Sequence, residues 1–529
     1  MAICKLRRIC LLTLVIALGT SAGLAQSFQI QCPDKTITHP TAANNNSEPA
    51  YHGPTTLTMG ANGHLVPSAN INGAIKCQQI SGGDGFATMG DGTQTYLFAF
   101  GPLSGLADIA KGLPGTEFPN VFNAVYSGTL VPGDPATTID NGAAFSYNGA
   151  VGLAPDLDAI ANGSCAAPCL NGHVDPRPIM DVGVLNGNMP APLMAIDEDD
   201  EFFLTLTNVG QVMRPDLFEQ HTVHFHGYPN ASAFYDGVPD ASVAINIGGS
   251  FTYYYLAPDA GTYFWHCHIT PPEHLQMGMV GQIYVRPRQN RVPVGNGLYA
   301  ALQQQQGDPR TACNSSADVL CSNPVPAVSN VVTRAATGKY AYNDGDGSTY
   351  YDVEYPLQIH GFDPNFHFVG MTFNPENFTD MKDKYFLLNG RSYPDTVMPG
   401  PLRTQTSDGS NHFAQPLPSI INIPAGGKAL LRIADLDVTE YQTLASLGIP
   451  MRVIGINAKL LRDQAGNNLY YTTNSITLAG GESLDVILDA SDTTKYPSGS
   501  VFFLYTPNLD HLSNDAENFG GLMTEVRIN

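Results

Sequence analysis

The chain has 529 residues, a formal net charge of −22 at pH 7 and only 14% charged residues. Acidic residues outnumber basic ones by 47 to 25, which disfavours a nucleic acid as partner, because contacts with phosphates need a surplus of Lys and Arg. A chain of this length exceeds one ordinary hydrophobic core and predicts two or three domains.

Residues 1–25 predict an export signal that is removed from the mature protein. Lys5, Arg7 and Arg8 precede an apolar run that is too short to span a bilayer, and small residues then lead to Ala25, a plausible cleavage site. No later apolar run reaches the roughly 18 residues that a membrane helix needs. We therefore expect a secreted or periplasmic protein without a membrane span.

Seven cysteines follow the signal, and an odd number in an oxidising compartment implies one thiol with a separate role. Cys267 is the candidate for this thiol, because it lies between His266 and His268. The other six are disulfide candidates, and the sequence leaves their connectivity open. The simplest pairing joins nearest neighbours: Cys32 with Cys77, Cys165 with Cys169, and Cys313 with Cys321.

Helical periodicity is scarce in the first half of the chain, and short alternating segments predict strands. Residues 26–90 are expected to form an irregular N-terminal extension, and residues 101–180 a long insertion rich in Gly, Pro and Asp. Loops of that length are usually functional or disordered. The predicted strands are 96–100, 179–184, 201–207 and 250–256, and strands continue to Val285.

A second strand-rich unit follows a polar linker at residues 291–325. Leu185-Asn-Gly-Asn-Met-Pro190 has a counterpart in Leu388-Asn-Gly-Arg-Ser-Tyr-Pro394, which indicates two copies of one sandwich. The predicted fold class is therefore all-β, with two Greek-key β-sandwich domains at residues 91–290 and 326–529. Predicted strands of the second unit are 429–433, 451–455, 484–488 and 501–505.

Six of the 14 histidines fall between positions 221 and 274. His224 and His226 alternate on one predicted strand and share a face, and His266 and His268 share a face of another. Two adjacent strands of this kind place four imidazoles on one side, while Cys267 points to the other side. A lone histidine is more often an ordinary core or surface residue, but this grouping around one unpaired thiol indicates a metal site.

The face to which Cys267 points offers a soft set of ligands. Cys267 is joined there by His274 and Met279 from the following loop. A thiolate, two imidazoles and a weak thioether form the blue-copper set, and the combination of Cys with Met disfavours the alternative of zinc. Met279 is preferred to Met277 as the axial ligand, because a strand begins directly after it.

These motifs together resemble the copper-binding domain of a multicopper oxidase of the cupredoxin superfamily. His221-Thr-Val-His224-Phe-His226-Gly is similar to that family's His-Pro-x-His-x-His-Gly, and Gly261-Thr-Tyr-Phe-Trp-His-Cys-His268 to its Gly-Thr-x-x-x-His-Cys-His. The similarity covers about 91–290 and 326–529. It implies a two-domain type of cupredoxin-like protein with a type 1 copper in the first domain and none in the second.

The resemblance also implies roles for individual residues. The type 1 copper ligands would be His221, Cys267 and His274, with Met279 in the axial position. One domain's half of a type 2/type 3 copper cluster would be His224, His226, His266 and His268. Asp236 resembles an acid that helps to deliver protons to such a cluster, with an ordinary turn residue as the alternative.

The sequence departs from the family in the second half of that cluster, because no other His-x-His pair occurs in the chain. His511 resembles a histidine that the related, trimeric copper nitrite reductases contribute across a subunit interface, so it is a candidate intersubunit copper ligand. A loop histidine bonded to its own turn is the alternative. His360 and His367 are expected in a surface loop. His224 stands where those reductases carry a catalytic aspartate, which disfavours a reductase.

We therefore expect a secreted, laccase-like copper oxidase. It would take electrons from a small-molecule or metal-ion donor through type 1 copper and pass them to dioxygen at a histidine-bound copper centre. One alternative is a blue-copper electron-transfer or copper-binding protein without a complete trinuclear cluster, or a structural protein that retains a copper fold. A second alternative is a nitrite-reductase-like homotrimer with a copper between subunits.

Overall fold

The computed structural model describes residues 30–529 except for 43–47, 110–112, 123–138, 141–142, 145–152, 156–160, 165–169, 175–178, 180–182, 184, 218, 228–231, 258, 308–322, 330, 371–376, 406–410 and 516. The predicted export signal and most of the predicted strand at 179–184 lie outside the described residues, as does much of the 101–180 insertion. The same holds for the disulfide candidates Cys165, Cys169, Cys313 and Cys321.

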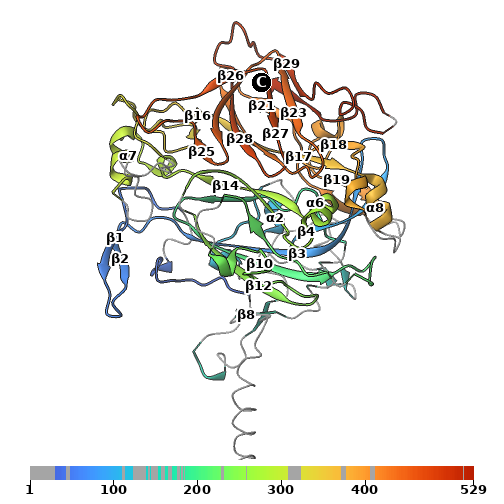
Figure 1. Cartoon of the computed structure of the whole chain (residues 1–529). Coiled ribbons are helices and arrows are strands. Elements are labelled where there is room, and N and C mark those ends of the chain that lie inside the picture. Colours follow the sequence, from blue (N-terminus) through green and yellow to red (C-terminus); the bar gives the residue numbers. More distant parts are fainter. Residues whose placement is uncertain are drawn as a thin grey trace, which may run out of the picture.

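The first of two β-sandwiches, blue to green in Figure 1, contains two mixed four-stranded sheets. One sheet has the strand order β12 (Ser250–Leu256), β10 (Glu201–Gly210), β3 (Ile75–Thr88) and β4 (Gln94–Pro102). The other has the order β11 (His224–Phe225), β13 (Gly261–His266), β14 (Val280–Arg286) and β9 (Met194–Asp197). One buried apolar cluster, which includes Leu204 from the first sheet and Trp265 from the second, joins them.

The second sandwich, orange to red in Figure 1, lies against the first. Its larger sheet has the order β18 (Tyr385–Leu388), β17 (Val353–Phe362), β22 (Lys428–Asp435), β28 (Ser483–Asp489), β24 (Met451–Ile456) and β25 (Lys459–Leu460), and β26 (Tyr471–Thr473) also pairs with β24. The smaller sheet has the order β21 (Ile421–Ile423), β30 (Met523–Ile528), β29 (Val501–Tyr505), β23 (Gln442–Leu447) and β27 (Ser475–Leu478). The predicted all-β class with two sandwiches is confirmed.

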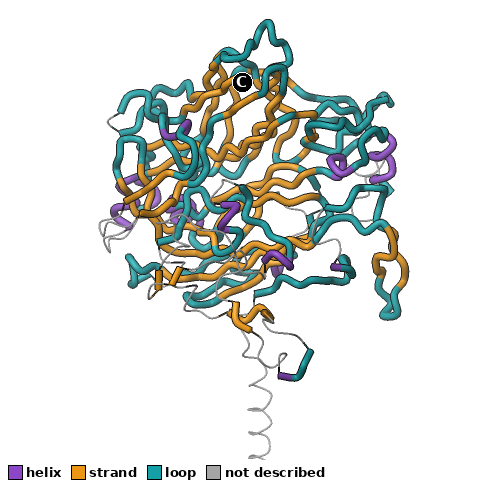
Figure 2. Tube along the Cα trace, turned by 180° about the vertical axis from the view of Figure 1, so that it is seen from behind, coloured by secondary structure: helices purple, strands orange, loops and turns teal. Residues whose placement is uncertain are grey.

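The remaining elements are short hairpins and short helices, most of them at the edges of the strand layers (Figure 2). The hairpins are β1 (Thr56–Met59) with β2 (Leu65–Ala69), β5 (Ile139–Asp140) with β6 (Ala143–Ala144), β7 (Leu153–Pro155) with β8 (Leu170–Val174), β15 (Lys339–Tyr340) with β16 (Tyr350–Tyr351), and β19 (Leu402–Gln405) with β20 (Asn411–Gln415). The helices are α2 (Leu106–Ile109), α3 (Pro119–Phe122), α6 (Pro271–Met277), α7 (Leu298–Gln305) and α8 (Pro364–Gly370), and the 3-10 turns are η3 (Ala233–Tyr235), η4 (Arg288–Arg291), η5 (Phe378–Asp380) and η6 (Asp395–Val397). Within the described residues, no helix has the length and apolar character of a membrane span.

The strand β3 contradicts the expectation of an irregular segment at 26–90. It is 14 residues long and pairs with β10 on one side and β4 on the other, so it lies inside the first sandwich. Gln78, Gln79 and Ser81 are buried although they are polar. These residues interrupt the apolar pattern from which strands are predicted, and the sequence prediction was wrong here for that reason.

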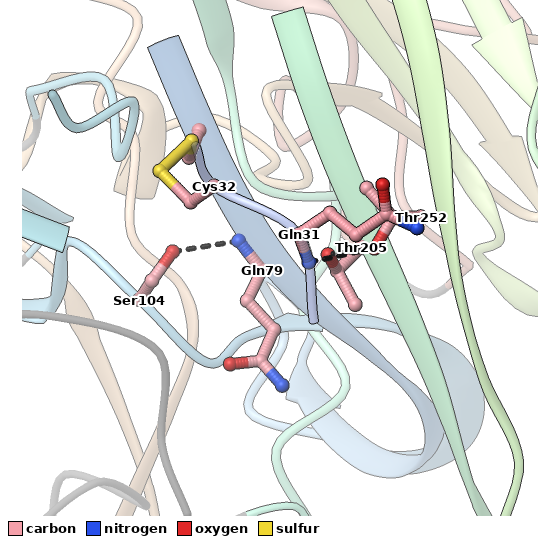
Figure 3. Close-up of a disulfide and its surroundings, with 7 residues drawn as sticks. Gln31, Cys32, Gln79, Ser104, Thr205 and Thr252 are labelled. Carbon is pink, nitrogen blue, oxygen red and sulfur yellow. Dashed lines mark hydrogen bonds between the residues drawn. A yellow bond between two sulfur atoms is a disulfide. The ribbon is translucent and has the colours of Figure 1, made fainter. Parts of the chain in front are cut away.

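A disulfide joins Cys32 to Cys77 and fixes the start of the described chain to β3 (Figure 3). Beside the disulfide, the backbone amide of Gln31 donates to Thr252 Oγ1 at 3.2 Å. The pairing of Cys32 with Cys77 predicted from the sequence is confirmed.

Replacing both Cys32 and Cys77 with alanine is expected to lower the free energy of unfolding by up to about 4 kcal/mol. The bridge closes a loop with a sequence separation of 45, and opening it restores conformational entropy to the unfolded chain. Denaturant titration of the non-reduced protein measures the effect. An unchanged unfolding midpoint would contradict a stabilising role for this bridge.

Buried polar contacts join the two sandwiches. Glu354 in β17 accepts hydrogen bonds from Arg286 in β14 at 2.8 Å and from Arg432 in β22 at 3.1 Å. Thr262 in β13 donates to Asp485 in β28 at 2.6 Å. The sheet of the first sandwich that ends in the histidine motifs is thereby fixed to the larger sheet of the second.

The substitution Glu354→Gln is expected to lower the free energy of unfolding at pH 7 by about 3 kcal/mol. It leaves the partly buried Arg286 without this anion and the fully buried Arg432 with only the more distant Asp485, at 3.6 Å. Burial alone would raise the pKa of Glu354, but Arg286 and Arg432 outweigh burial and lower the pKa from 4.5 to about 2. The stabilisation by this carboxylate is therefore complete above about pH 4.5 and is lost as the pH falls towards 2.

Denaturant titrations between pH 7 and pH 2 measure this effect, and the loss of stability attributed to Glu354 should be absent from the variant. Asp489→Asn is the matched control, because Asp489 and Lys428 form an ion pair that is more exposed than that of Glu354. Such a pair contributes less than about 1 kcal/mol. Equal effects of the two substitutions would rule out a special role for Glu354.

Candidate metal centres

The end of β13 carries Cys267 into the interior of the first sandwich. His221 lies before β11, where its backbone pairs with Ile245, and His274 lies in α6. All three side chains are buried, and their donor atoms lie within 4.8 Å of one another. The structure thus brings together the three residues that the resemblance implies as ligands of one metal.

The segment between Cys267 and Met279 contains the helix α6, and Pro271 and Pro272 are its first two residues. Proline is tolerated in the first turn of a helix, where its missing N–H would have no partner in any case. The amide of Met279 donates to the carbonyl of His274 at 2.8 Å, and the amide of Cys267 donates to the carbonyl of Met279 at 3.1 Å. These bonds fix the buried Met279 next to the three donor residues.

The polar atoms of this group fit a metal better than they fit one another. Neither ring nitrogen of His221 has a hydrogen-bond partner, although the ring is fully buried. Buried polar atoms without a hydrogen-bond partner are uncommon in folded proteins, and a bound metal ion would explain the two nitrogens of His221. The Cys267 sulfur accepts from the Thr222 amide at 3.4 Å and lies 3.3 Å from His274 Nδ1.

Electrostatics favours the thiolate form of Cys267. Burial raises the pKa of its thiol, but the charge on His274 outweighs burial and holds the pKa well below its usual value. Burial likewise lowers the pKa of His274, and the thiolate outweighs this and raises it to about 10. A preformed thiolate with two imidazoles and a nearby thioether is the donor set that suits copper.

Two further residues contact this group and were not singled out from the sequence. A Cβ atom at Gly82 in β3 would lie 2.7 Å from the His221 ring and 3.3 Å from the Met279 methyl group, so only glycine leaves room for both. The Phe98 ring in β4 packs edge-on against His274, with 5.1 Å between ring centroids. A glycine within a strand is the one sequence signal for such a close approach.

A second group of histidines lies where β11 pairs with β13, with His224 directly opposite His266. Ring nitrogens of His224, His226 and His266 lie within 4.8 Å of one another, and His226 Nε2 is 3.0 Å from His266 Nε2. His224 Nδ1 donates to the Asp236 carbonyl at 2.7 Å, and His266 Nδ1 donates to the Cys267 carbonyl at 2.6 Å. Each of these bonds leaves Nε2 of the ring free for a metal.

Burial lowers the pKa of His266 to about 3, so its ring is neutral at pH 7, which is the form that binds metals. His268 lies at the edge of the group, with its ring centroid 5.0 Å from that of His224. The carboxylate of Asp236 lies 3.5 Å from His224 Nδ1, so both its backbone and its side chain face this ring.

His511 lies in the second sandwich, where both of its ring nitrogens have partners. Nδ1 is 3.0 Å from Gln442 Oε1, Nε2 is 2.9 Å from Glu440 Oε2, and the ring stacks on Phe386. The structure of the single chain therefore places His511 in a network of its own sandwich. Its role between subunits stays a prediction.

The expectation that His360 and His367 lie in a surface loop is wrong, because both are buried. His360 is in β17, and its Nε2 donates to the Leu275 carbonyl at 3.0 Å. His367 is in α8, with Nδ1 2.6 Å from the Tyr96 carbonyl and Nε2 2.9 Å from the Gln276 carbonyl. Packing of the second sandwich against α6 covers both rings.

Comparison with known proteins relates part of the chain to copper enzymes. Residues 171–290 match the sequence profile of the multicopper oxidase family. A laccase of Aspergillus fumigatus is 34% identical over 109 residues, and a copper-containing nitrite reductase of Rhizobium meliloti is 35% identical over 109 residues. These alignments cover 20% of this chain in both cases, and 17% of the laccase and 26% of the reductase, so the chain spans only a minor part of the relatives that it matches.

The solved structure of the multicopper oxidase mgLAC aligns with 86% of this chain and 87% of its own, at 15% identity and a TM-score of 0.47. The matched segment 171–290 contains both histidine motifs. This segment is thus related to multicopper oxidases, and copper is the metal that the relationship implies.

Proposed function

We propose that the chain is an exported copper-dependent oxidase that takes electrons from a small-molecule or metal-ion donor and delivers them to dioxygen. The observation that carries the proposal is the arrangement at the end of β13. Cys267 joins one group of donor atoms inside the sandwich, and the adjacent His266 belongs to a second group of imidazoles. An electron-storage protein would need only the first group.

The proposal assigns the two groups to different copper centres. His221, Cys267, His274 and the axial Met279 would hold type 1 copper, and His224, His226, His266 and His268 would hold copper of the type 2/type 3 kind. When bound, copper supplies a one-electron acceptor at the first centre and a site of oxygen reduction at the second.

The side chains and backbone around the two groups have definite tasks. The Thr222 amide stabilises the Cys267 thiolate, and in the metal-free chain the protonated His274 does so as well; this proton would be lost on copper binding. The carbonyls of Asp236 and Cys267 fix the tautomers and the orientation of His224 and His266. The peptide bond between His266 and Cys267 is a short covalent connection between the groups, and the partly exposed Asp236 carboxylate is placed to hold a proton beside His224.

A second candidate function is blue-copper electron transfer without oxygen reduction. It is favoured by one observation: among the described residues, histidines occur in only two groups of three or more side chains that could hold a metal, and these are the two groups already described. In the oxidase, the missing histidines would come from another copy of the chain, and a homotrimer is the arrangement that the resemblance to nitrite reductases implies.

Copper analysis combined with oxygen-uptake measurements separates the two functions. For the oxidase we expect more than one copper per chain, the visible absorption of a copper–thiolate bond, and oxygen uptake with phenols or reduced metal ions as donors. A single copper per chain without oxygen uptake would exclude the oxidase and support electron transfer.

A further inference from the structure

The helix α6, which carries His274, is held by the second sandwich through Gln276. This side chain is fully buried. Its Oε1 accepts from the Asp363 amide at 2.9 Å, and its Nε2 donates to Asp383 Oδ1 at 3.0 Å. Both partners of Gln276 belong to the second sandwich and are 87 and 107 positions away in the sequence. The position of α6 therefore depends on residues that are distant along the chain.

Side chains of the second sandwich also contact the last carbonyls of α6. The Leu275 carbonyl accepts from His360, and the Gln276 carbonyl lies 2.9 Å from Nε2 of the buried His367. Carbonyls in the last turn have no donors within their own helix and take partners from elsewhere. A helix of seven residues is too short to be stable alone, so these contacts decide where it lies.

The Asp383 carboxyl that binds Gln276 lies beside a second carboxyl, that of Asp437, and Thr439 joins the two. The Thr439 hydroxyl donates to Asp383 Oδ2 and is 3.2 Å from Asp437 Oδ1. Burial raises the pKa of Asp383 well above its usual value, and the nearby Asp437 raises it further. A Cβ atom at Gly361 in β17 would collide with both carboxyls, and glycine is therefore required beside the pair.

The network continues from this pair to the surface. Gln442 Nε2 donates to Asp437 Oδ2 at 2.5 Å, and Gln442 Oε1 accepts from His511 Nδ1 at 3.0 Å. His511 Nε2 donates to Glu440, whose side chain is 47% exposed. An unbroken series of hydrogen bonds thus leads from solvent to α6, and His511 is a member of it.

We propose that Asp383, supported by Asp437, is a positioning residue for the copper loop: through Gln276 it fixes α6 and thereby the distance between His274 and Cys267. The inference rests on the type 1 centre of the proposed function. His274 precedes Gln276 by two residues in the same helix, and Met279 is bonded to the His274 carbonyl. A shift of Gln276 therefore moves two of the four donor residues relative to Cys267.

Three variants of the full-length protein test the proposal. Asp383→Leu and Gln276→Met each remove the bond between these two side chains. Each is expected to weaken copper binding at the type 1 centre by about 10- to 100-fold, to shift the copper–thiolate absorption band and to change the reduction potential. Asp383→Asn keeps the acceptor for Gln276 and provides an amide donor for Asp437, so it is expected to retain the affinity, band and potential of the unchanged protein.

A fourth variant controls for loss of stability alone. Asp344 is a buried carboxyl of the second sandwich that binds Gln289 and Thr349, so Asp344→Leu should lower the unfolding midpoint without changing the absorption band. Because Asp383 and Gln276 act as one unit, the double variant Asp383→Leu/Gln276→Met should be no worse than either single variant. If Asp383→Leu does not fold, the comparison of Gln276→Met with Asp383→Asn carries the same test.

Folded variants with unchanged affinity, band and potential would overturn the positioning role, as would additive effects in the double variant or an Asp383→Asn variant as impaired as Asp383→Leu. Absence of a copper–thiolate band from the unsubstituted protein would instead overturn the type 1 centre itself, and the positioning role with it. The two failures are therefore distinguishable.

Discussion

Replacing Cys267 with serine is expected to abolish the copper–thiolate absorption of the protein and to reduce its oxidase activity to background. The serine hydroxyl is not ionised at neutral pH and is a hard donor, whereas the Cys267 thiol is held in its ionised form by His274. The copper content should fall by one per chain. Absorption spectroscopy, metal quantification and oxygen uptake with a reducing donor measure the three effects on one preparation.

The Cys32→Ala/Cys77→Ala variant is the control, because it also removes sulfur but not from the metal site. It should keep the absorption band although it is less stable. The free energy of unfolding of metal-free Cys267→Ser protein should be lower than that of the metal-free unsubstituted protein by only about 1–3 kcal/mol, which is the cost of a poorly paired buried hydroxyl. A band that survives in Cys267→Ser would assign the thiolate to another cysteine and refute the ligand set.

The separation of Cys267 from the four histidines of the second group could be predicted from strand alternation. His224 and His226 share a face, as do His266 and His268, because successive side chains of a strand point in opposite directions. Local periodicity was sufficient for this separation. It did not assign His221, which lies 46 positions before Cys267 and was identified through the resemblance to multicopper oxidases.

The surroundings of the site could not be predicted because they come from strands and loops that are distant in sequence. Gly82 and Phe98 reach the donor residues only because β3 and β4 pair within the first sandwich, and the polar residues of β3 conceal that strand. No periodicity in one segment reports on the pairing of two segments, so contacts of this kind require the fold.

The contacts of the second sandwich with α6 were concealed in the same way. His367 and Asp383 are polar, and residues of these types are usually exposed, so they were not expected in the interior. Docking of one sandwich on the other buries them and gives them partners. The grouping of the candidate donor residues was therefore easier to predict than the contacts that hold them in place.

The double substitution His224→Ala/His226→Ala is expected to stop oxygen uptake while it preserves the copper–thiolate band. Both side chains lie in or directly after β11 and belong to the group opposite Cys267, and their removal leaves only His266 and His268 of the four proposed donors. Two imidazoles bind copper much more weakly than four, so this centre should lose its copper. The first centre keeps all four of its donor residues.

The outcome can be read in a single optical experiment. A reducing donor should bleach the band in both proteins, and air should restore it in the unsubstituted protein only, because electrons leave the first centre through His266 and the neighbouring imidazoles. His52→Ala, on an exposed histidine, is the matched control and should behave like the unsubstituted protein. Equal reoxidation in the double variant would show that oxygen reacts elsewhere, and failure of the unsubstituted protein to reoxidise would identify it as an electron-transfer protein.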